Sequence, residues 1–415
     1  MHKIFILSRW WGVIYCQITL TLMGSGGLSS EQYKAAMGGP VTPSFAGTPI
    51  SFSDLVQSST TMYNIRSSGR YYIAGDLKID AGSNDSTVIK ITANNVSLNL
   101  NTAMIYQNTT DVATGLIGIE IASNVSGVKI YNGMINGNTT NMVNGIKVNS
   151  GASNIFMEDL VVIGCYTAGA EVVGVLLNSC SLVQMENCEF NGHSSASSNA
   201  VIGLKMVDCT KCLIEGCLSM GNSSVSGSVH GFKLDSSSGG CKYNSLINCK
   251  SINNSSSSGN ALGFCANNGQ GNVFEACVAQ GNVGAGTYAA GFKFAGTEKY
   301  SSIINCASIA NNGSAGTGYG IWMPSGVTFC EVRGNRVLGN YGLTNGYGIY
   351  DDTTVTLANL YLANVAHGSV NNAGTVNNYA ITVSFTLAKL TATYNVLTNL
   401  SSSQNGLYNI DVTKV

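Results

Sequence analysis

The sequence predicts an all-β protein: a single right-handed parallel β-helix of about ten coils, with an N-terminal lead-in and a C-terminal cap. First, glycine followed by an apolar residue recurs at intervals of 27 to 32 residues, which indicates one structural unit stacked on copies of itself. Second, polar and apolar residues alternate within each repeat, which is the period of short strands. Third, no segment of the repeats has a sustained apolar stripe at helical spacing. The marker glycines are Gly118, Gly145, Gly174, Gly203, Gly231, Gly263, Gly291, Gly320 and Gly348.

The chain before the repeats is expected to contain a leader and a lead-in. Residues 1–28 combine a basic start, an apolar stretch and small residues, which is the pattern of a secretory signal peptide. Residues 29–70 contain three of the four prolines of the chain and are interpreted as a lead-in or N-terminal cap. The expected location is therefore outside the cell or on its surface.

The coils are expected over residues 71–368, and two aligned columns locate a turn within each coil. A column of Asn and Gly, which tolerate the left-handed backbone region, marks a sharp bend between two strands. The next column is expected to point inward, where a tight bend leaves little room, and its members stack about 4.8 Å apart. This second column reads Asn132, Asp159, Cys188, Cys217, Cys249, Cys277, Cys306 and Asn335.

These inner stacks beside a tight Asn-bearing turn resemble those of the pectin-lyase-like superfamily of right-handed parallel β-helix repeats. The opening SGRYYIAGDLKID, followed by VIKITANNVSLNLNTAMI, is similar to the first coils of its CASH/NosD-like members, which bind carbohydrates or hydrolyse sugars. The resemblance covers roughly Tyr71 to His367 and implies the fold. Because the superfamily includes lyases, hydrolases, epimerases, adhesins and phage spikes, the resemblance implies no particular reaction.

The end of the chain and its composition limit the choice of partners. Residues 369–415 lose the repeat and are expected to cover the exposed apolar end of the solenoid. Outside the leader, no stretch has the 18 or more apolar residues that a membrane helix needs, so no membrane span is expected in the mature chain. Charged residues make up 10% of the chain and the net charge is −1, so a nucleic-acid partner is not expected.

The cysteines are interpreted as packing residues. Five of the thirteen occupy the same place in successive coils, where parallel side chains in register point alongside one another. Inward thiols are therefore favoured, with bridges between neighbouring coils as the alternative. Cys209 and Cys212 have zinc-ligand spacing but no histidine in register, so no metal site is expected. His193 and His230 fall in variable outer turns in this alignment and are interpreted as surface residues.

Four acidic residues are weak candidates for catalysis. Asp351 and Asp352 are adjacent on a predicted strand, so only one of them is expected beside an outer groove. Glu186 and Glu215 hold the same place in adjacent coils and are expected to lie about 5 Å apart on the outside. Such carboxylates would serve as acid and base in a hydrolase or hold calcium in a lyase. A solvated surface is the favoured interpretation for both pairs.

A row of lysines and aromatic residues is the candidate ligand-binding face. Lys147, Lys205, Lys233 and Lys293 share the third position of the Gly-apolar-x motif, while Trp322 and Tyr350 occupy this position in later coils. Lysines would attract an acidic polysaccharide, and aromatic rings would stack on sugars. The alternative, favoured because Leu176 interrupts the row, is that the lysines keep the sheet face soluble.

We therefore expect a secreted or cell-surface protein that presents a long face to a polysaccharide, another glycan or a surface protein, without catalysis and without a cofactor. One alternative is a polysaccharide lyase, hydrolase or epimerase, and only the lyase would require Ca²⁺. A second alternative is a phage-type spike or structural filament protein. The oligomeric state is left open.

Overall fold

The computed structural model describes residues 47–55, 60–79, 87–107, 115–137, 142–237, 239–352 and 359–375, and the strand backbone at 377–381, 392–393 and 396–397. All of them belong to one compact unit that begins at Ala46. The predicted signal peptide at 1–28, most of the predicted lead-in and most of the predicted C-terminal cap lie outside the described residues.

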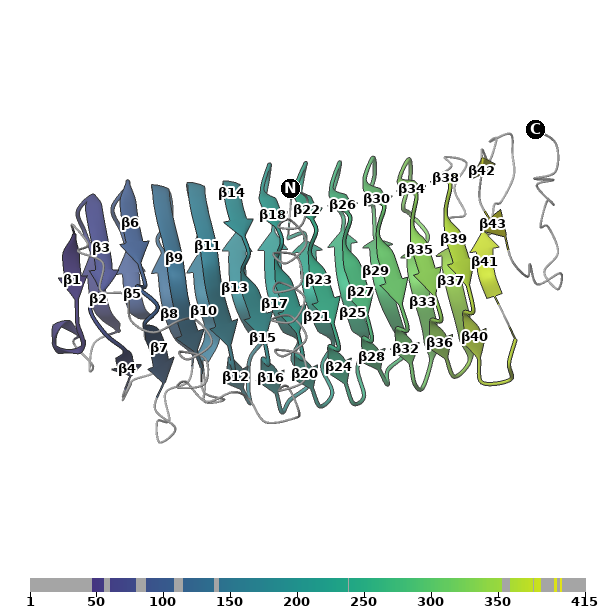
Figure 1. Cartoon of the computed structure of the whole chain (residues 1–415), viewed down its shortest axis with the longest axis horizontal. Coiled ribbons are helices and arrows are strands. Elements are labelled where there is room, and N and C mark those ends of the chain that lie inside the picture. The colour runs from purple at the N-terminus through teal and green to yellow at the C-terminus, as the bar shows by residue number, and fades with distance from the viewer. Residues whose placement is uncertain are drawn as a thin grey trace, which may run out of the picture. The chain divides into compact units, whose positions relative to one another are not determined.

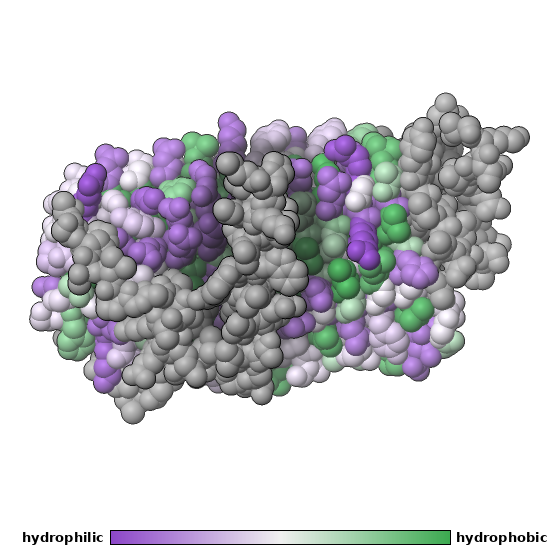
Figure 2. All heavy atoms as spheres, in the orientation of Figure 1, coloured by the Kyte–Doolittle hydropathy of each residue, from purple (hydrophilic) through white to green (hydrophobic). Residues whose placement is uncertain are grey.

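The described residues wind as a parallel β-solenoid, as the sequence predicts (Figure 1). Hydrophilic and hydrophobic residues are interspersed on the face shown in Figure 2. Each strand pairs in parallel with the equivalent strand of the next coil, as β17 pairs with β13 on one side and β21 on the other. The only helix among the described elements is the short 3-10 helix η1 (Phe52–Asp54). The all-β prediction of about ten coils is confirmed, and strands that lie outside the predicted range of 71–368 join the same sheets at both ends.

Sheet I has 12 strands. Its strands in order are β2 (Thr61–Ile65), β5 (Thr87–Ile91), β8 (Leu116–Ile121), β10 (Met142–Val148), β13 (Val172–Asn178), β17 (Val201–Val207), β21 (Val229–Asp235), β25 (Ala261–Asn267), β29 (Tyr288–Ala295), β33 (Thr317–Met323), β37 (Asn345–Asp351) and β41 (Asn377–Ile381).

Sheet II has 23 strands in two ladders, which the long strands β9 (Ser126–Asn136) and β11 (Ser153–Ile163) join. The first ladder also contains β1 (Thr48–Ile50), β3 (Gly69–Ile73), β6 (Val96–Asn99), β14 (Ser181–Glu186), β18 (Leu213–Glu215), β22 (Ser245–Ile247), β26 (Val273–Glu275), β30 (Ser302–Ile304), β34 (Glu331–Arg333), β38 (Leu360–Leu362) and β42 (Ala392–Thr393). The second contains β4 (Leu77–Ile79), β7 (Met104–Gln107), β15 (Glu189–Asn191), β19 (Leu218–Met220), β23 (Lys250–Ile252), β27 (Val278–Gln280), β31 (Ala307–Ile309), β35 (Arg336–Leu338), β39 (Val365–His367) and β43 (Val396–Leu397).

Sheet III has 8 strands of two residues each. They are β12 (Tyr166–Thr167), β16 (Ser194–Ser195), β20 (Ser223–Ser224), β24 (Ser255–Ser256), β28 (Val283–Gly284), β32 (Asn312–Gly313), β36 (Tyr341–Gly342) and β40 (Val370–Asn371).

The repeating glycine is required by the close approach of neighbouring coils in sheet I. A Cβ atom added at Gly203 would lie 2.7 Å from the carbonyl oxygen of Gly231 and would overlap the hydroxyl of Ser219. At Gly231 the carbonyl oxygen of Gly263 would be 2.8 Å away. Any side chain would therefore push the strand away from the next coil, so the period seen in the sequence marks a packing constraint.

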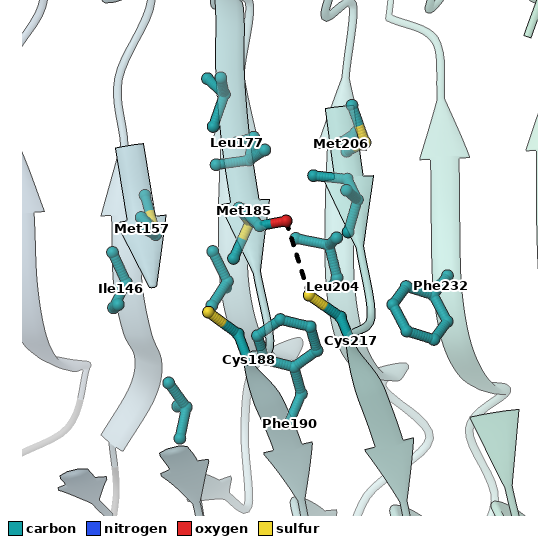
Figure 3. Packing of buried hydrophobic residues seen from close by; sticks show 14 of the residues in the cluster. Ile146, Met157, Leu177, Met185, Cys188, Phe190, Leu204, Met206, Cys217 and Phe232 are labelled. Carbon is teal, nitrogen blue, oxygen red and sulfur yellow. Dashed lines mark hydrogen bonds between the residues drawn. The ribbon is translucent and has the colours of Figure 1, made fainter. Parts of the chain in front are cut away.

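The interior of the solenoid is built from stacked identical or similar side chains. The cysteine column from Cys188 to Cys306 is buried, as predicted, and Figure 3 shows Cys188 and Cys217 among the interior side chains. Its thiols donate to carbonyl oxygens of the preceding coil, as Cys217 does to Met185 at 4.0 Å. Burial raises the pKa of Cys249 and Cys277 well above the ordinary thiol value, and all the described cysteines are free.

The predicted column is shifted by one residue in its first two coils. Asn132 and Asp159 have φ of 61° and 51°, and they belong to the preceding, left-handed column with Asn187. Their inward neighbours Gly133 and Leu160, which pair in register, precede the cysteines in the inner column. The bend of these two coils therefore lies at Asn132 and Asp159 themselves, one residue later than the alignment of the repeats predicts.

An asparagine ladder lies inside the next bend. Asn222, Asn254, Asn282, Asn311 and Asn340 are buried, and the amide Nδ2 of each of the first four donates to the Oδ1 of the next at 2.8 to 3.0 Å. Their Oδ1 atoms also accept from backbone N–H groups of the preceding coil. Because a buried polar group must be hydrogen-bonded, the ladder explains why asparagine repeats at this position.

Candidate functional site

Strand register in sheet I brings the predicted lysines and aromatic residues into one row. Buried positions such as Leu204 and Met206 alternate with the partly exposed Lys205, so the row lies on the outer face. Successive pairings run through Glu120, Lys147, Leu176, Lys205, Lys233, Cys265, Lys293, Trp322 and Tyr350. This placement agrees with the sequence alignment at every position.

Three lysines of sheet I are neutralised by neighbouring carboxylates. Lys205 pairs with Glu171 at 2.7 Å, Lys233 with Asp235 at 2.6 Å, and Lys90 with Glu120 at 3.2 Å. Burial alone would lower the pKa of Lys233, but the hydrogen bond and charge of Asp235 outweigh burial and raise it. The lysine row therefore does not form a continuous positively charged surface.

The C-terminal end of the row forms a cluster of rings, which we call the aromatic platform: Tyr288, Tyr319, Trp322, Tyr347 and Tyr350 together with Lys293. The Tyr319 and Trp322 rings stack at a centroid distance of 4.5 Å and an angle of 11°. Tyr347 and Tyr350 lie 4.6 Å apart, and Tyr319 stacks on Tyr347 at 5.6 Å. All five aromatic side chains are partly exposed.

The local sequence explains why these rings meet. In Tyr-Gly-Ile-Trp (319–322) and Tyr-Gly-Ile-Tyr (347–350), the glycine lies at the crowded corner of the strand and the isoleucine is buried. The first and fourth residues of each motif therefore share the outer face. Pairing of Tyr319 with Tyr347 then stacks the two motifs one coil apart.

Lys293 is held within the platform by the rings. Its Nζ lies 4.0 Å from the Trp322 ring centroid and 4.4 Å from the Tyr288 ring centroid, and it donates to the Tyr288 hydroxyl at 3.0 Å. The ring faces attract the ammonium. Among the described residues Lys293 forms no ion pair, so no carboxylate neutralises its charge there.

The phenols of the platform are hydrogen-bonding groups and not bases. Burial, with the nearby Tyr350 as a smaller cause, raises the pKa of Tyr319 well above its ordinary value. Burial also raises the pKa of Tyr347 and Tyr350. All three hydroxyls are therefore protonated at neutral pH and can donate hydrogen bonds.

Asp351, one of the two predicted acids at this end, lies inside the solenoid. Its carboxylate accepts from the Tyr361 hydroxyl at 2.5 Å and from the Asn359 Nδ2 at 3.1 Å, and it is buried. Asp351 therefore does not lie beside an outer groove, and at most one acid of the pair does, as strand alternation predicts. Asp352 lies on the outer side, and burial together with the charge of Asp351 raises its pKa.

Glu186 and Glu215 are brought together on sheet II as predicted. They pair directly in register, so their strands lie about 4.8 Å apart. Glu186 accepts a hydrogen bond from Gln184 at 2.6 Å. Each glutamate directly precedes a residue that lines a shallow groove along the bend of this sheet. The groove is lined by Asn187, Glu189, Gly216, Leu218, Asn248, Lys250 and Ala276.

The histidines differ from the sequence interpretation, because both are buried. His193 takes the first position of the asparagine ladder, where its backbone N–H donates to Asn222 Oδ1 at 2.9 Å. Burial lowers the pKa of His193 and His230 to about 3, so both rings are neutral at pH 7. Neither histidine is a surface residue.

The zinc-ligand spacing of Cys209 and Cys212 belongs to a cluster of buried thiols. Cys180 and Cys209 lie 3.5 Å apart between sulfur atoms. Within the part of the chain that the structure describes, no group of three or more His, Cys, Asp or Glu residues is arranged to hold a metal ion. No helix there has the length and apolar character of a membrane span.

Comparisons with known proteins find no matching family model and no matching curated protein. Among solved structures, the enzymatically active domain of bacteriophage CBA120 tailspike protein 2 is 13% identical with a TM-score of 0.44. The alignment covers 80% of this chain and 49% of that one, so the chain spans about half the length of the tailspike domain.

Two further structures are similar over most of their own length. The A-module of the Azotobacter vinelandii mannuronan C-5 epimerase AlgE6 is 13% identical, with 82% of this chain and 91% of that chain covered and a TM-score of 0.37. A rhamnogalacturonan lyase is 13% identical, with 76% and 78% covered and a TM-score of 0.35. The solenoid fold implied by the pectin-lyase-like resemblance is established by the strand pairing itself.

Proposed function

We propose that the protein binds a polysaccharide without catalysis on the outer face of sheet I, with the aromatic platform as the centre of the site. The observation that carries the proposal is the stacking of partly exposed Tyr319, Trp322, Tyr347 and Tyr350 on one face. Large, rigid rings offer much contact area at a small entropic cost, and the tyrosine hydroxyls can bond to the hydroxyls of sugar rings.

Lys293 favours a polysaccharide that carries carboxylates. Its ammonium is fixed between two rings, so little freedom is lost when an anionic group binds. Charge-assisted hydrogen bonds to a uronate carboxylate are stronger than those to a neutral hydroxyl. An acidic polysaccharide in the medium or on a cell surface is consistent with the predicted secretory leader, and we propose that the protein acts there.

The chemistry of the platform favours binding over turnover. Glycoside hydrolysis requires two carboxyl groups on opposite sides of the scissile bond. Of the two acids predicted near the platform, Asp351 points inward and bonds to Tyr361, which leaves Asp352 alone on the outside. The protonated phenols are no substitute for a general base at neutral pH.

The proposal is tested by measuring the affinity of the full chain for alginate, polygalacturonate and dextran. We expect Trp322→Ala and Tyr319→Ala to weaken binding by roughly tenfold or more, about 1.4 kcal/mol, whereas Trp322→Phe retains most of it. Lys293→Gln is expected to weaken binding to alginate and polygalacturonate only. Tyr166→Ala, which removes a partly exposed tyrosine from β12 of sheet III, is the matched control and should leave affinity unchanged.

Two results would count against this function. Equal affinity of the wild type and the Trp322 and Tyr319 variants would exclude the platform as the site. An increase in absorbance at 235 nm or release of reducing sugars, with or without Ca²⁺, would show turnover. Such turnover would favour the lyase or hydrolase alternative, with Asp352, Glu186 and Glu215 as the next residues to substitute.

A further inference from the structure

A second exposed aromatic surface lies at the turn that leads from sheet I to sheet II. Isolated parallel bridges join Ser181, Thr210, Lys242, Gln270, Lys299 and Thr328 of successive coils. The residue after each of them has a positive φ, between 53° and 64°. We call these six residues the turn row: Leu182, Lys211, Tyr243, Gly271, Tyr300 and Phe329.

The residues of the turn row are poorly suited to their backbone conformation. The left-handed region favours Gly and Asn, which occupy the equivalent position in earlier coils at Gly127 and Asn154. A bulky side chain with this φ is an outlier that costs folding free energy. Leu182, Tyr243, Tyr300 and Phe329 nevertheless adopt it with φ of 53° to 57°.

The same side chains are also exposed to solvent, so burial does not offset the backbone strain. Their exposed fractions are 49% for Leu182, 55% for Tyr243, 54% for Tyr300 and 42% for Phe329. Neither folding nor solubility favours large apolar residues at a strained, exposed turn. An interaction with a ligand explains their presence.

The rings form a partly continuous aromatic surface. Tyr300 and Phe329 stack at 5.1 Å with an interplanar angle of 10°. The Tyr243 ring lies beside Gly271, where an added Cβ would be 2.7 Å from a ring carbon, so the glycine leaves room for the ring. Gln270 donates to the Tyr243 hydroxyl at 3.3 Å and bridges this coil to the next.

The turn carries three lysines and one partly exposed carboxylate, Asp208, whose oxygens accept hydrogen bonds from Ser237, Gly239 and Gly240. Lys211 belongs to the turn row, and Lys242 and Lys299 directly precede Tyr243 and Tyr300. None of the three forms an ion pair with another described residue, and neither turn column contains an acidic residue. An anionic ligand with flat apolar faces would therefore match the surface in both charge and shape.

We propose that the turn row is a second binding site for an acidic polysaccharide, separate from the aromatic platform. The sugar faces stack on Tyr243, Tyr300 and Phe329, and uronate carboxylates bind Lys211, Lys242 and Lys299. Polysaccharide is favoured over nucleic acid because three lysines on a chain of net charge −1 give a weak phosphate-binding surface. A twofold contact with a second copy would bring lysines against lysines.

The test combines stability and binding in the full-length chain. The triple variant Tyr243→Asn, Tyr300→Asn, Phe329→Asn places a suitable residue at three left-handed positions and removes the rings. We expect its Tm to rise by a few degrees and its affinity for polygalacturonate to fall by roughly tenfold or more. Ala310→Asn is the matched control: it relaxes an exposed position with φ of 52° outside the turn row. It should raise the Tm slightly and leave affinity unchanged.

Each other outcome overturns the inference. A lower Tm of the triple variant would show that the rings serve the fold, and unchanged affinity for polygalacturonate would exclude the site. A wild-type dimer that the triple variant abolishes, or loss of binding to an oligonucleotide alone, would assign the turn row to a second copy or to nucleic acid. If the aromatic platform is not a binding site, Trp322→Ala will leave the affinity for polygalacturonate unchanged, while the triple variant still weakens it. The two proposals can therefore fail separately.

Discussion

At the scale of single residues, space inside the coil decides which side chains are accepted. The repeating glycine of sheet I has no room for a Cβ, because the next coil places a carbonyl oxygen 2.7 Å from that position at Gly203. By contrast, Gly169 has no atom within 4 Å of an added Cβ. The two glycines therefore differ sharply in what substitution should cost.

We expect Gly203→Ala to destabilise the fold by about 1 to 3 kcal/mol, because the methyl group forces the strand away from the next coil. Gly169→Ala is the control and should change the free energy of unfolding by less than about 0.5 kcal/mol. Denaturant titration of both variants measures the difference. Equal stabilities would show that the glycine period has another cause.

The residue scale is also where the sequence predicted least. Strand alternation predicts that only one of Asp351 and Asp352 faces outward, but it does not predict that Asp351 is the inward one, bonded to Tyr361 ten residues away. His193 is interpreted as an outer-turn residue because the ladder position that it fills is asparagine in most later coils. The turn row was not predicted from the sequence either, although Leu182, Lys211 and Tyr243 each follow a buried cysteine by two residues.

At the scale of elements, stacked ladders make each position depend on its neighbours one coil away. The asparagine ladder begins at His193, whose Nδ1 accepts the Cys165 backbone N–H at 3.2 Å. Its Nε2 is buried without a hydrogen-bond partner. Protonation would place a charge in the interior, which is why burial lowers the pKa to about 3.

His193→Asn is therefore expected to change how stability depends on pH. The pKa of His193 is lower in the folded state than the ordinary value of about 6.5, so acid favours the unfolded state as pH falls below 6.5. Between pH 7 and pH 5 the wild type should lose about 2 kcal/mol relative to the variant. Urea unfolding at both pH values measures this change. If the free energies of unfolding of the wild type and the variant change equally between the two pH values, the His193 imidazole is not buried in its neutral form.

Element register was the part of the candidate site that the sequence predicted well. The Gly-apolar-x motif aligned Lys293, Trp322 and Tyr350 correctly, because the motif itself is a packing constraint repeated in every coil. It could not reveal that Tyr288, Tyr319 and Tyr347 join them. Their rings meet because of the directions in which the side chains leave the strand next to the repeating glycine. The spacing of the repeats does not specify these directions.

At the scale of the whole solenoid, each coil contacts chiefly its neighbours, so energetic coupling should be local. The Phe232, Phe264 and Phe292 rings stack one per coil at centroid distances of 4.8 and 4.9 Å. Such ring pairs contribute beyond the area that they bury. The fold class was predictable at this scale because the same constraint recurs in many coils.

We expect Phe232→Leu and Phe264→Leu to be non-additive, with a coupling free energy of about 0.5 to 1.5 kcal/mol. Phe232→Leu combined with Ile349→Val, several coils away, should be additive within about 0.5 kcal/mol. Double-mutant cycles from denaturant unfolding provide both values. A large coupling free energy between Phe232 and Ile349 would contradict the expectation that coupling is limited to neighbouring coils.

The measurement that tests the central claim most directly is the fluorescence of Trp322 during titration with oligogalacturonate. The chain has three tryptophans, so Trp10→Phe and Trp11→Phe leave Trp322 as the only indole. Because Trp322 stacks on Tyr319 beneath Lys293, we predict a saturable change in its emission that Lys293→Gln weakens. Saturable binding to the same chain, measured by calorimetry, without any change in Trp322 emission would place the ligand elsewhere and contradict the platform.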